Sequence, residues 1–176
     1  MQFDLNKTLE ILDNTPSVLR ALLSDLNEDW TQHNEGGESW SPYDVLGHLI
    51  HGEKTDHMAR VNKILGDDPV NTFAPFDRFA QFEESKGKTI QQLLEEFAIV
   101  RKKNMDYLRS KKLHPFQFEL VGNHPSLGVV TLRNLLSSWT VHDLTHISQI
   151  TRVMAKQYKE NIGPWIEYFR VLQDPQ

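Results

Sequence analysis

Two histidines stand four positions apart, His142 and His146, in the stretch SWTVHDLTHISQI that runs from Ser138 to Ile150. Residues at i and i+4 lie on the same face of an α-helix, so their imidazole nitrogens can converge on one ion. Neutral imidazole is a good ligand for zinc, nickel, iron or copper. The spacing therefore predicts two ligands of a divalent metal site.

The same spacing has two other interpretations. The H-E-x-x-H motif of zinc proteases has the same spacing, but it needs a general-base glutamate directly after the first histidine. Here that position is Asp143, whose side chain is one methylene shorter, which excludes a metalloprotease of that type. The alternative is that each imidazole is an ordinary core residue, hydrogen-bonded to a backbone carbonyl or a hydroxyl.

The pair lies on a helix expected from about Thr131 to Tyr158. Its apolar positions recur at helical spacing, and three or four residues beyond Trp139 the same stripe reaches His142 and then His146. Both rings are therefore expected to face the interior. Trp139 is expected to pack in the core, with lining of a substrate pocket as its alternative. The apolar positions are Leu132, Leu135, Leu136, Trp139, Ile147, Ile150, Val153 and Met154.

A metal site in a helical bundle needs further ligands from a facing helix. The candidate is a helix that Ser41 caps and that runs to Leu65, before Gly66. It carries four candidate ligands, which are His48, His51, Glu53 and His57.

Periodicity leaves the choice among these four open. Glu53 and His57 lie nearest the apolar stripe of their helix, and His48 lies on a flank of small residues. His51 falls on a side with charged residues and is expected to be exposed. The remaining histidines fall in loops, where exposed rings are expected; they are His33, His114 and His124.

Two more long helices complete the expected fold. One runs from about Asp4 to Leu26, with Pro16 as a potential kink or break, and the other starts at Thr89, with Gln92 completing a capping box. A short helical segment restarts at Pro164. The long connections 66–88 and 110–130 allow crossovers, so the prediction is an all-α four-helix bundle with a crossover connection, in one domain over residues 1–176.

Phenylalanines in the first connection indicate a loop that packs onto the bundle; they are Phe73, Phe76, Phe79 and Phe82. Residues 114–130 leave room for short extended pieces but are too brief to predict a sheet.

Composition narrows the function classes. The formal net charge is −5, which argues against a nucleic-acid partner, and basic clusters such as Arg101 to Lys103 are expected to be solvated surface. The chain has no apolar run long enough to cross a bilayer, and its N-terminus lacks the features of a secretory signal, so a cytoplasmic protein is expected. Cys is absent, so the ligands of any metal must be His and carboxylates, and any thiol must come from a second molecule.

Three stretches resemble the DinB-like superfamily: WSPYDVLGHLIHGE, HPSLGVVTLRNLL and HDLTHISQI. That family has one histidine on its second helix and an H-x-x-x-H pair on its fourth. Position by position, the resemblance implies His48, His142 and His146 as the metal ligands. It also implies a four-helix bundle that often dimerises and that binds a divalent ion, with zinc or nickel expected here.

The activity that the resemblance implies is broad. Some family members resemble maleylpyruvate isomerases and others transfer bacillithiol or mycothiol. The leading hypothesis is a three-histidine site with an open coordination position, in a thiol transferase or hydrolase that acts on a small molecule. The alternative is a non-enzymatic binding module with a structural ion, closed by a fourth ligand such as Glu53 or His57, or with no ion. Glu53 and Asp143 are either carboxylates that orient a ligating imidazole or acids on the helix surface.

Overall fold

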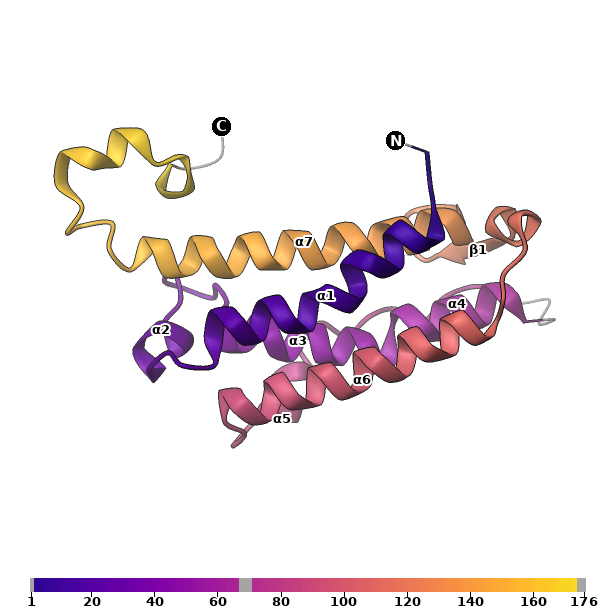
Figure 1. Cartoon of the computed structure of the whole chain (residues 1–176), viewed down its shortest axis with the longest axis horizontal. Helices are drawn as coiled ribbons and strands as arrows, with labels where there is room; N and C mark the ends of the chain where they lie inside the picture. The colour runs from indigo at the N-terminus through magenta and orange to yellow at the C-terminus, as the bar shows by residue number, and fades with distance from the viewer. Residues whose placement is uncertain (1, 67–70, 174–176) are drawn as a thin grey trace.

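The computed structural model of the protein describes residues 2–66 and 71–173. Four long helical rods lie side by side in it, one of them made of two successive helices (Figure 1). This arrangement confirms the predicted four-helix bundle. The rods are α1 (Leu5–Leu23), α3 (Pro42–Thr55) with α4 (His57–Leu65), α6 (Ile90–Ser110) and α7 (Leu132–Lys156).

Short elements fill the connections between these rods. The strands β1 and β2 form an antiparallel hairpin in which Val121 pairs with Thr131. Neither the hairpin nor α5 was predicted, because elements of four or five residues are too short to show a clear period. The short elements are α2 (Glu28–Gln32), α5 (Gln81–Ser85), β1 (Val121–His124), β2 (Gly128–Thr131) and the 3₁₀ helices η1 (Pro115–Glu119), η2 (Gly163–Tyr168) and η3 (Arg170–Leu172).

The helix starts follow local side-chain chemistry. Ser41 and Thr89 each form a capping box, with Asp44 and Gln92 respectively, as their sequences predict. Thr131 caps α7 in the same way, with its hydroxyl accepting from the backbone N–H of Asn134. Each box satisfies backbone N–H groups that would otherwise lack a partner.

The helices differ from expectation at one internal break and at two ends. The helix expected from Ser41 to Leu65 is broken at Asp56, where φ is −115° and ψ is −74°. The apolar stripe continues across the break, so periodicity could not reveal it. Pro16 lies inside α1 without splitting it, and α1 ends at Leu23 instead of Leu26. The last long helix, α7, ends at Lys156, two residues before the expected end.

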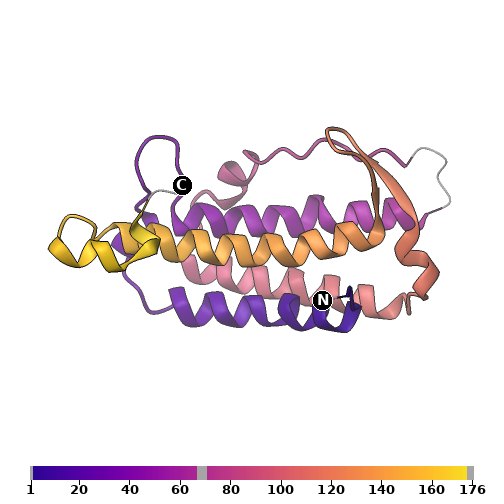
Figure 2. The same ribbon diagram turned by 90° about the horizontal axis from the view of Figure 1, so that it is seen from above.

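The order of the rods around the bundle requires a crossover. Both α1 and α3 contact α6 and α7, so α1 and α3 occupy opposite corners. In Figure 1, α1 and α7 run in one direction while α3, α4 and α6 run in the other. Because α4 and α6 are parallel, the chain must return along the bundle between them. Figure 2 shows the described part of that connection, residues 71–89, running back beside α3 and α4.

The core consists of two apolar clusters with a polar layer between them. One cluster includes Leu12 and Trp139, and the other includes Leu19 and Phe97. Between the two clusters, each rod carries a buried polar side chain instead of an apolar one. These side chains are Thr15, Glu53, Arg101 and Asp143.

The crossover connection packs only in part. Phe73 is 4% exposed and Phe76 is half-buried, but Phe79 and Phe82 are 56% and 39% exposed. The predicted packing of this loop onto the bundle is therefore confirmed at Phe73 and Phe76, whereas Phe79 and Phe82 are exposed. The C-terminal segment does contact the bundle, through buried Leu172 of η3 beside α7.

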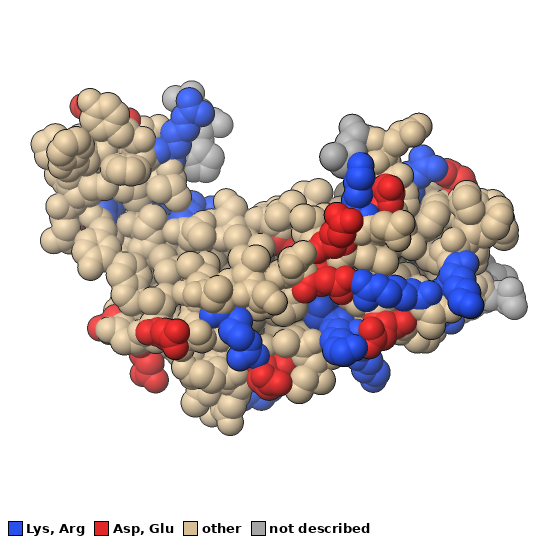
Figure 3. Space-filling view, viewed as in Figure 1, with Lys and Arg blue, Asp and Glu red and all other residues tan. Residues whose placement is uncertain are grey.

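Charges of both signs are interspersed on the face shown in Figure 3. Ion pairs link neighbouring rods at the surface, such as Arg20 with Glu95 and Arg109 with Asp13. No helix of the described residues is long and apolar enough to span a membrane.

Candidate metal centre

Three imidazoles from two rods meet inside the bundle. The Nε2 atom of His142 lies 3.1 Å from Nε2 of His48 and 3.1 Å from Nε2 of His146. All three ligand atoms lie within 4.8 Å of one another, and no other such group of three potential ligands occurs among the described residues. Tetrahedral ligands with zinc–nitrogen bonds of about 2.0–2.1 Å place their nitrogens roughly 3.3 Å apart. The spacing therefore suits a common metal ion.

Local structure explains this convergence. His142 and His146 are one turn apart on α7, and His48 is on α3, which packs antiparallel to α7. Trp40 and Phe76 pack against the His48 ring, with ring centroids 4.9 and 5.5 Å away. The aromatic contacts hold His48 toward α7 and shield it from solvent, so its ring is 6% exposed.

The hydrogen bonds among the three rings cannot satisfy all three Nε2 atoms at once, whereas a cation between them would. Gln149 accepts a hydrogen bond from Nδ1 of His146 at 2.8 Å, which leaves Nε2 of that ring without a proton. Nε2 of His142 carries either one proton or one lone pair, so it cannot satisfy both neighbouring nitrogens. A cation between the three nitrogens would accept all three lone pairs at once.

The rings are also in the protonation state that metals require. Burial lowers the pKa of His48 to about 3 and that of His142 to about 3, with a further contribution from the neighbouring imidazoles. Burial lowers the pKa of His146 as well, against the hydrogen bond from its ring to Gln149. All three imidazoles are therefore neutral near pH 7, with lone pairs free to bind a metal.

The two acidic candidates near the site bind an arginine instead. Arg101 donates to Glu53 at 2.8 Å and to Asp143 at 2.6 Å, and all three side chains are at most 1% exposed. Glu53 also accepts from Nε1 of Trp139 at 2.9 Å. Neither carboxylate hydrogen-bonds to any of the three converging rings among the described contacts. The expectation that these acids lie on the helix surface is wrong, and so is the prediction that Arg101 is solvated.

The arginine went unrecognised because its neighbours Lys102 and Lys103 are exposed, as the prediction had it. Three successive side chains on a helix point in three different directions, and here that of Arg101 points into the polar layer of the core. Counting Arg101 on the apolar stripe of α6, four residues after Phe97 and before Met105, would have revealed it.

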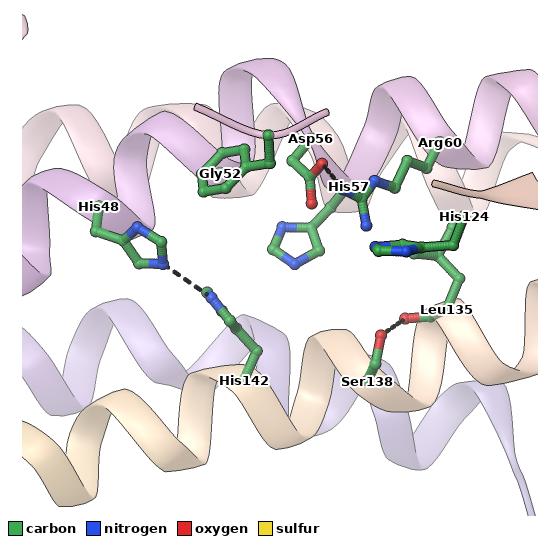
Figure 4. Close-up of a pocket in the computed structure, with 10 residues that line it drawn as sticks. His48, Gly52, Asp56, His57, Arg60, His124, Leu135, Ser138 and His142 are labelled. Atoms are coloured by element: carbon green, nitrogen blue, oxygen red, sulfur yellow. Dashed lines mark hydrogen bonds and ion pairs between the residues drawn. The ribbon is translucent and has the colours of Figure 1, made fainter. Parts of the chain in front are cut away.

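A cavity of about 300 Å³ opens beside His48 and His142 (Figure 4). Asp56 and Arg60 form an ion pair of 2.6 Å in its wall. Burial raises the pKa of the Asp56 carboxyl, an effect that the guanidinium of Arg60 opposes. The lining residues are His48, Gly52, Asp56, His57, Arg60, Phe76, His124, Leu135, Ser138 and His142.

The other histidines divide between this cavity and the rest of the molecule. His57 stacks on buried Trp139 at 4.6 Å and lines the cavity, but it is not part of the three-nitrogen group. His124 is half-buried at the cavity wall, although it was expected to be exposed. His33 and His114 are exposed, as predicted.

The prediction that His51 is exposed is also wrong, since this residue is 4% exposed. Its Nδ1 lies 3.0 Å from Glu84 of α5, and Phe76 covers its ring. The crossover connection buries this side of α3, and a helical wheel of α3 alone cannot show that.

Neither Glu53 nor His57 closes the centre as a fourth ligand. Of the described side chains, only the three histidines form the group, and the cavity adjoins two of them. Trp139 is fully buried as core packing, while Leu135 and Ser138 of the same helix line the cavity. The arrangement offers three potential ligands beside an accessible space.

Comparisons with known proteins agree with the fold. The model of the DinB superfamily matches residues 11–150. Among solved structures, the chain is similar to YfiT from Bacillus subtilis, with a TM-score of 0.73, 20% identity and 86% of each chain covered. YfiT is described as a probable metal-dependent hydrolase with an unusual four-helix bundle topology. No curated protein matches the chain.

Proposed function

The chain belongs to the DinB superfamily, and on that basis we propose that His48, His142 and His146 bind one divalent metal ion in an enzyme that acts on a small molecule. The observation that carries this proposal is the convergence of three Nε2 atoms, with contacts of 3.1 Å, beside a cavity. Zinc and nickel are the proposed ions, because both suit neutral imidazole.

The donor set favours a catalytic ion over a structural one. Structural zinc sites are closed by four protein ligands, whereas catalytic sites have three and leave a position open. When bound, a divalent ion acts as a Lewis acid and lowers the pKa of a water or thiol that it binds. The chain's own contribution is to hold three neutral rings in place and to surround them with a partly apolar wall.

We propose hydrolysis as the reaction class. The structurally similar YfiT is described as a probable metal-dependent hydrolase. A cavity of about 300 Å³ lies at the lower end of the range for ligand pockets and suits one small organic molecule with water. Thiol transfer is the second candidate, because a chain without Cys would need a thiol from outside. A homodimer and a cytoplasmic location stay predictions from the sequence.

Metal content tests the proposal directly. Protein purified without a His-tag is expected to hold about one zinc or nickel ion per chain, and chelation is expected to lower its melting temperature. His142→Ala should lose the ion while keeping its helical circular dichroism, and His33→Ala is the matched control in an exposed ring. An ion-free wild type that zinc and nickel do not stabilise would overturn the proposal.

Activity then separates an enzyme from a binding module. A panel of small esters and amides, with and without a low-molecular-weight thiol, should show turnover that chelation abolishes and metal restores. Turnover only with the thiol would replace hydrolysis by transfer. Tight metal binding with no turnover on the panel favours a structural ion.

A further inference from the structure

The cavity follows the two rods that carry the imidazoles. Every fourth residue of the rod that α3 and α4 form lines one side of the cavity. These residues are His48, Gly52, Asp56 and Arg60. The α7 helix lines the opposite side through Leu135, Ser138 and His142. Figure 4 shows the cavity between the two rods. The three-histidine group therefore lies at one end of an elongated space, and Arg60 lies at the other.

Arg60 is held firmly at that end. It donates to Asp56 at 2.6 Å, and its guanidinium carbon lies 5.3 Å from the centroid of the Phe73 ring. Its Nε atom is buried and has no hydrogen-bond partner in the described structure. A buried N–H group without an acceptor is unfavourable, so an acceptor supplied by a ligand would stabilise it. Nδ1 of His57, also on the cavity wall, is likewise buried without a hydrogen-bond partner in the described structure.

The charges around the cavity select the sign of that ligand. Asp56 is the only carboxylate among the lining residues, and Arg60 neutralises it. The buried group of Arg101, Glu53 and Asp143 carries at most one net negative charge, because burial raises the pKa of the Glu53 carboxyl. A divalent ion exceeds that charge, so the loaded cavity is positive and favours an anion.

Helix geometry sets the length of the ligand. The twelve residue steps from His48 to Arg60 span about 18 Å along the rod at 1.5 Å per residue. Helical side chains point back toward the N-terminus, and the pairing of Arg60 with Asp56 one turn earlier agrees with that direction. The His48 ring is tilted in the same direction, but the arginine side chain is longer, so the guanidinium lies less than about 18 Å from the imidazole group.

We propose that the cavity binds a small organic acid whose carboxylate is held by Arg60 while its reacting group faces the three histidines. The position of the carboxylate rests on Arg60 and the cavity lining, whereas the preference for an anion rests partly on the charge of the proposed ion and so on the proposed function, as does the reacting end. Arginine is suited to this task, because its guanidinium donates charge-assisted hydrogen bonds to a carboxylate. Asp56 acts as a positioning residue that keeps Arg60 at the cavity wall.

Bifunctional probes test the proposal. Monohydroxamates of straight-chain dicarboxylic acids, from succinic to suberic acid, carry a metal-binding group at one end and a carboxylate at the other. Each is compared with the neutral probe in which an amide replaces the carboxylate. Binding to zinc-loaded protein is measured by calorimetry, for the wild type, Arg60→Gln and the charge-conserving Arg60→Lys.

The expected result is at least about tenfold tighter binding of one acid probe than of its amide, a preference that Arg60→Gln abolishes and Arg60→Lys partly keeps. Equal affinity of acid and amide for the wild type at every length would overturn the proposal, and this comparison does not depend on any variant folding.

A second arm separates this inference from the proposed function. Glutarate and its neutral diamide are titrated into metal-free protein, and chemical shifts of the histidine rings are followed. Glutarate binding that requires Arg60, in a protein that binds neither metal nor hydroxamate, supports the acid site and refutes the metal centre. Hydroxamate binding without any preference for a carboxylate supports the metal centre and refutes the acid site.

Discussion

Gln149 accepts a hydrogen bond from Nδ1 of His146 at 2.8 Å, one turn further along the same helix. The bond fixes the tautomer in which Nε2 faces His142 without a proton. Gln149 was not singled out in the sequence, although its spacing of three residues from His146 places it within reach on the same face.

Removal of this acceptor should weaken metal binding without removing a ligand. We expect Gln149→Leu to lower the affinity for zinc about 10- to 100-fold, in the range found for partners of ligating histidines. Gln149→Glu keeps an acceptor oxygen and should retain most of the affinity. Competition with a chromogenic chelator measures both, and an unchanged affinity in Gln149→Leu would refute the orienting role.

Loss of the buried arginine should destabilise the fold strongly. Arg101→Met leaves Glu53 and Asp143 buried without their cation, and we expect unfolding to become easier by about 3–5 kcal/mol. The neighbouring exposed Lys102→Met should change stability by less than about 0.5 kcal/mol.

Neutralising the whole group tests the cause of that loss. Arg101→Met combined with Glu53→Gln and Asp143→Asn should recover part of the stability, because no uncompensated buried charge remains. Urea unfolding measures the free energy of unfolding of the wild type and of each of these variants. A triple variant no more stable than Arg101→Met would show that packing, and not charge, dominates.

The tight contact between the hairpin and the crossover connection makes Gly122 sensitive to substitution. A Cβ at this position would lie 2.5 Å from Cε1 of the Phe73 ring, which is 4% exposed and has little room to move. We expect Gly122→Ala to destabilise the protein by about 1–3 kcal/mol. Gly52→Ala in α3 is the control, since its Cβ would meet His57 at an ordinary 3.4 Å. Similar melting temperatures for the two variants would contradict the contact.

An ion pair between the loop before α3 and the end of α7 should make stability depend on pH. Arg152 donates to both carboxylate oxygens of Glu35, at 2.7 and 2.9 Å, and holds the pKa of that carboxyl below its ordinary value of 4.5. A lowered folded-state pKa stabilises the fold above the unfolded value, and the benefit is lost as pH falls through the folded value.

We therefore expect Glu35→Gln to be less stable than the wild type at pH 7 and equally stable at the lowest pH that still gives a reversible transition. Arg152 is 39% exposed, so the difference at pH 7 should stay below about 1 kcal/mol. Urea unfolding over a series of pH values measures it. A difference that grows toward low pH would contradict the sign.

The sequence by itself determined the long helices and two members of the three-histidine group. Helical periodicity and capping residues such as Ser41 and Thr89 are local properties, so they predicted the rods and their starts. The spacing of His142 and His146 on one face followed from the same local geometry. The third histidine did not, because periodicity left four candidates on the second rod, and the resemblance to the family singled out His48.

Only the tertiary structure decided which polar side chains are buried and with what partner. Arg101 meets Glu53 and Asp143 from 48 and 42 residues away, and no pattern within one helix records that contact. The burial of His51 depends on the crossover connection packing against α3, and the cavity depends on how α7 lies beside α3 and α4. Such contacts arise because separate rods pack at a fixed register, and that register is a property of the folded chain as a whole.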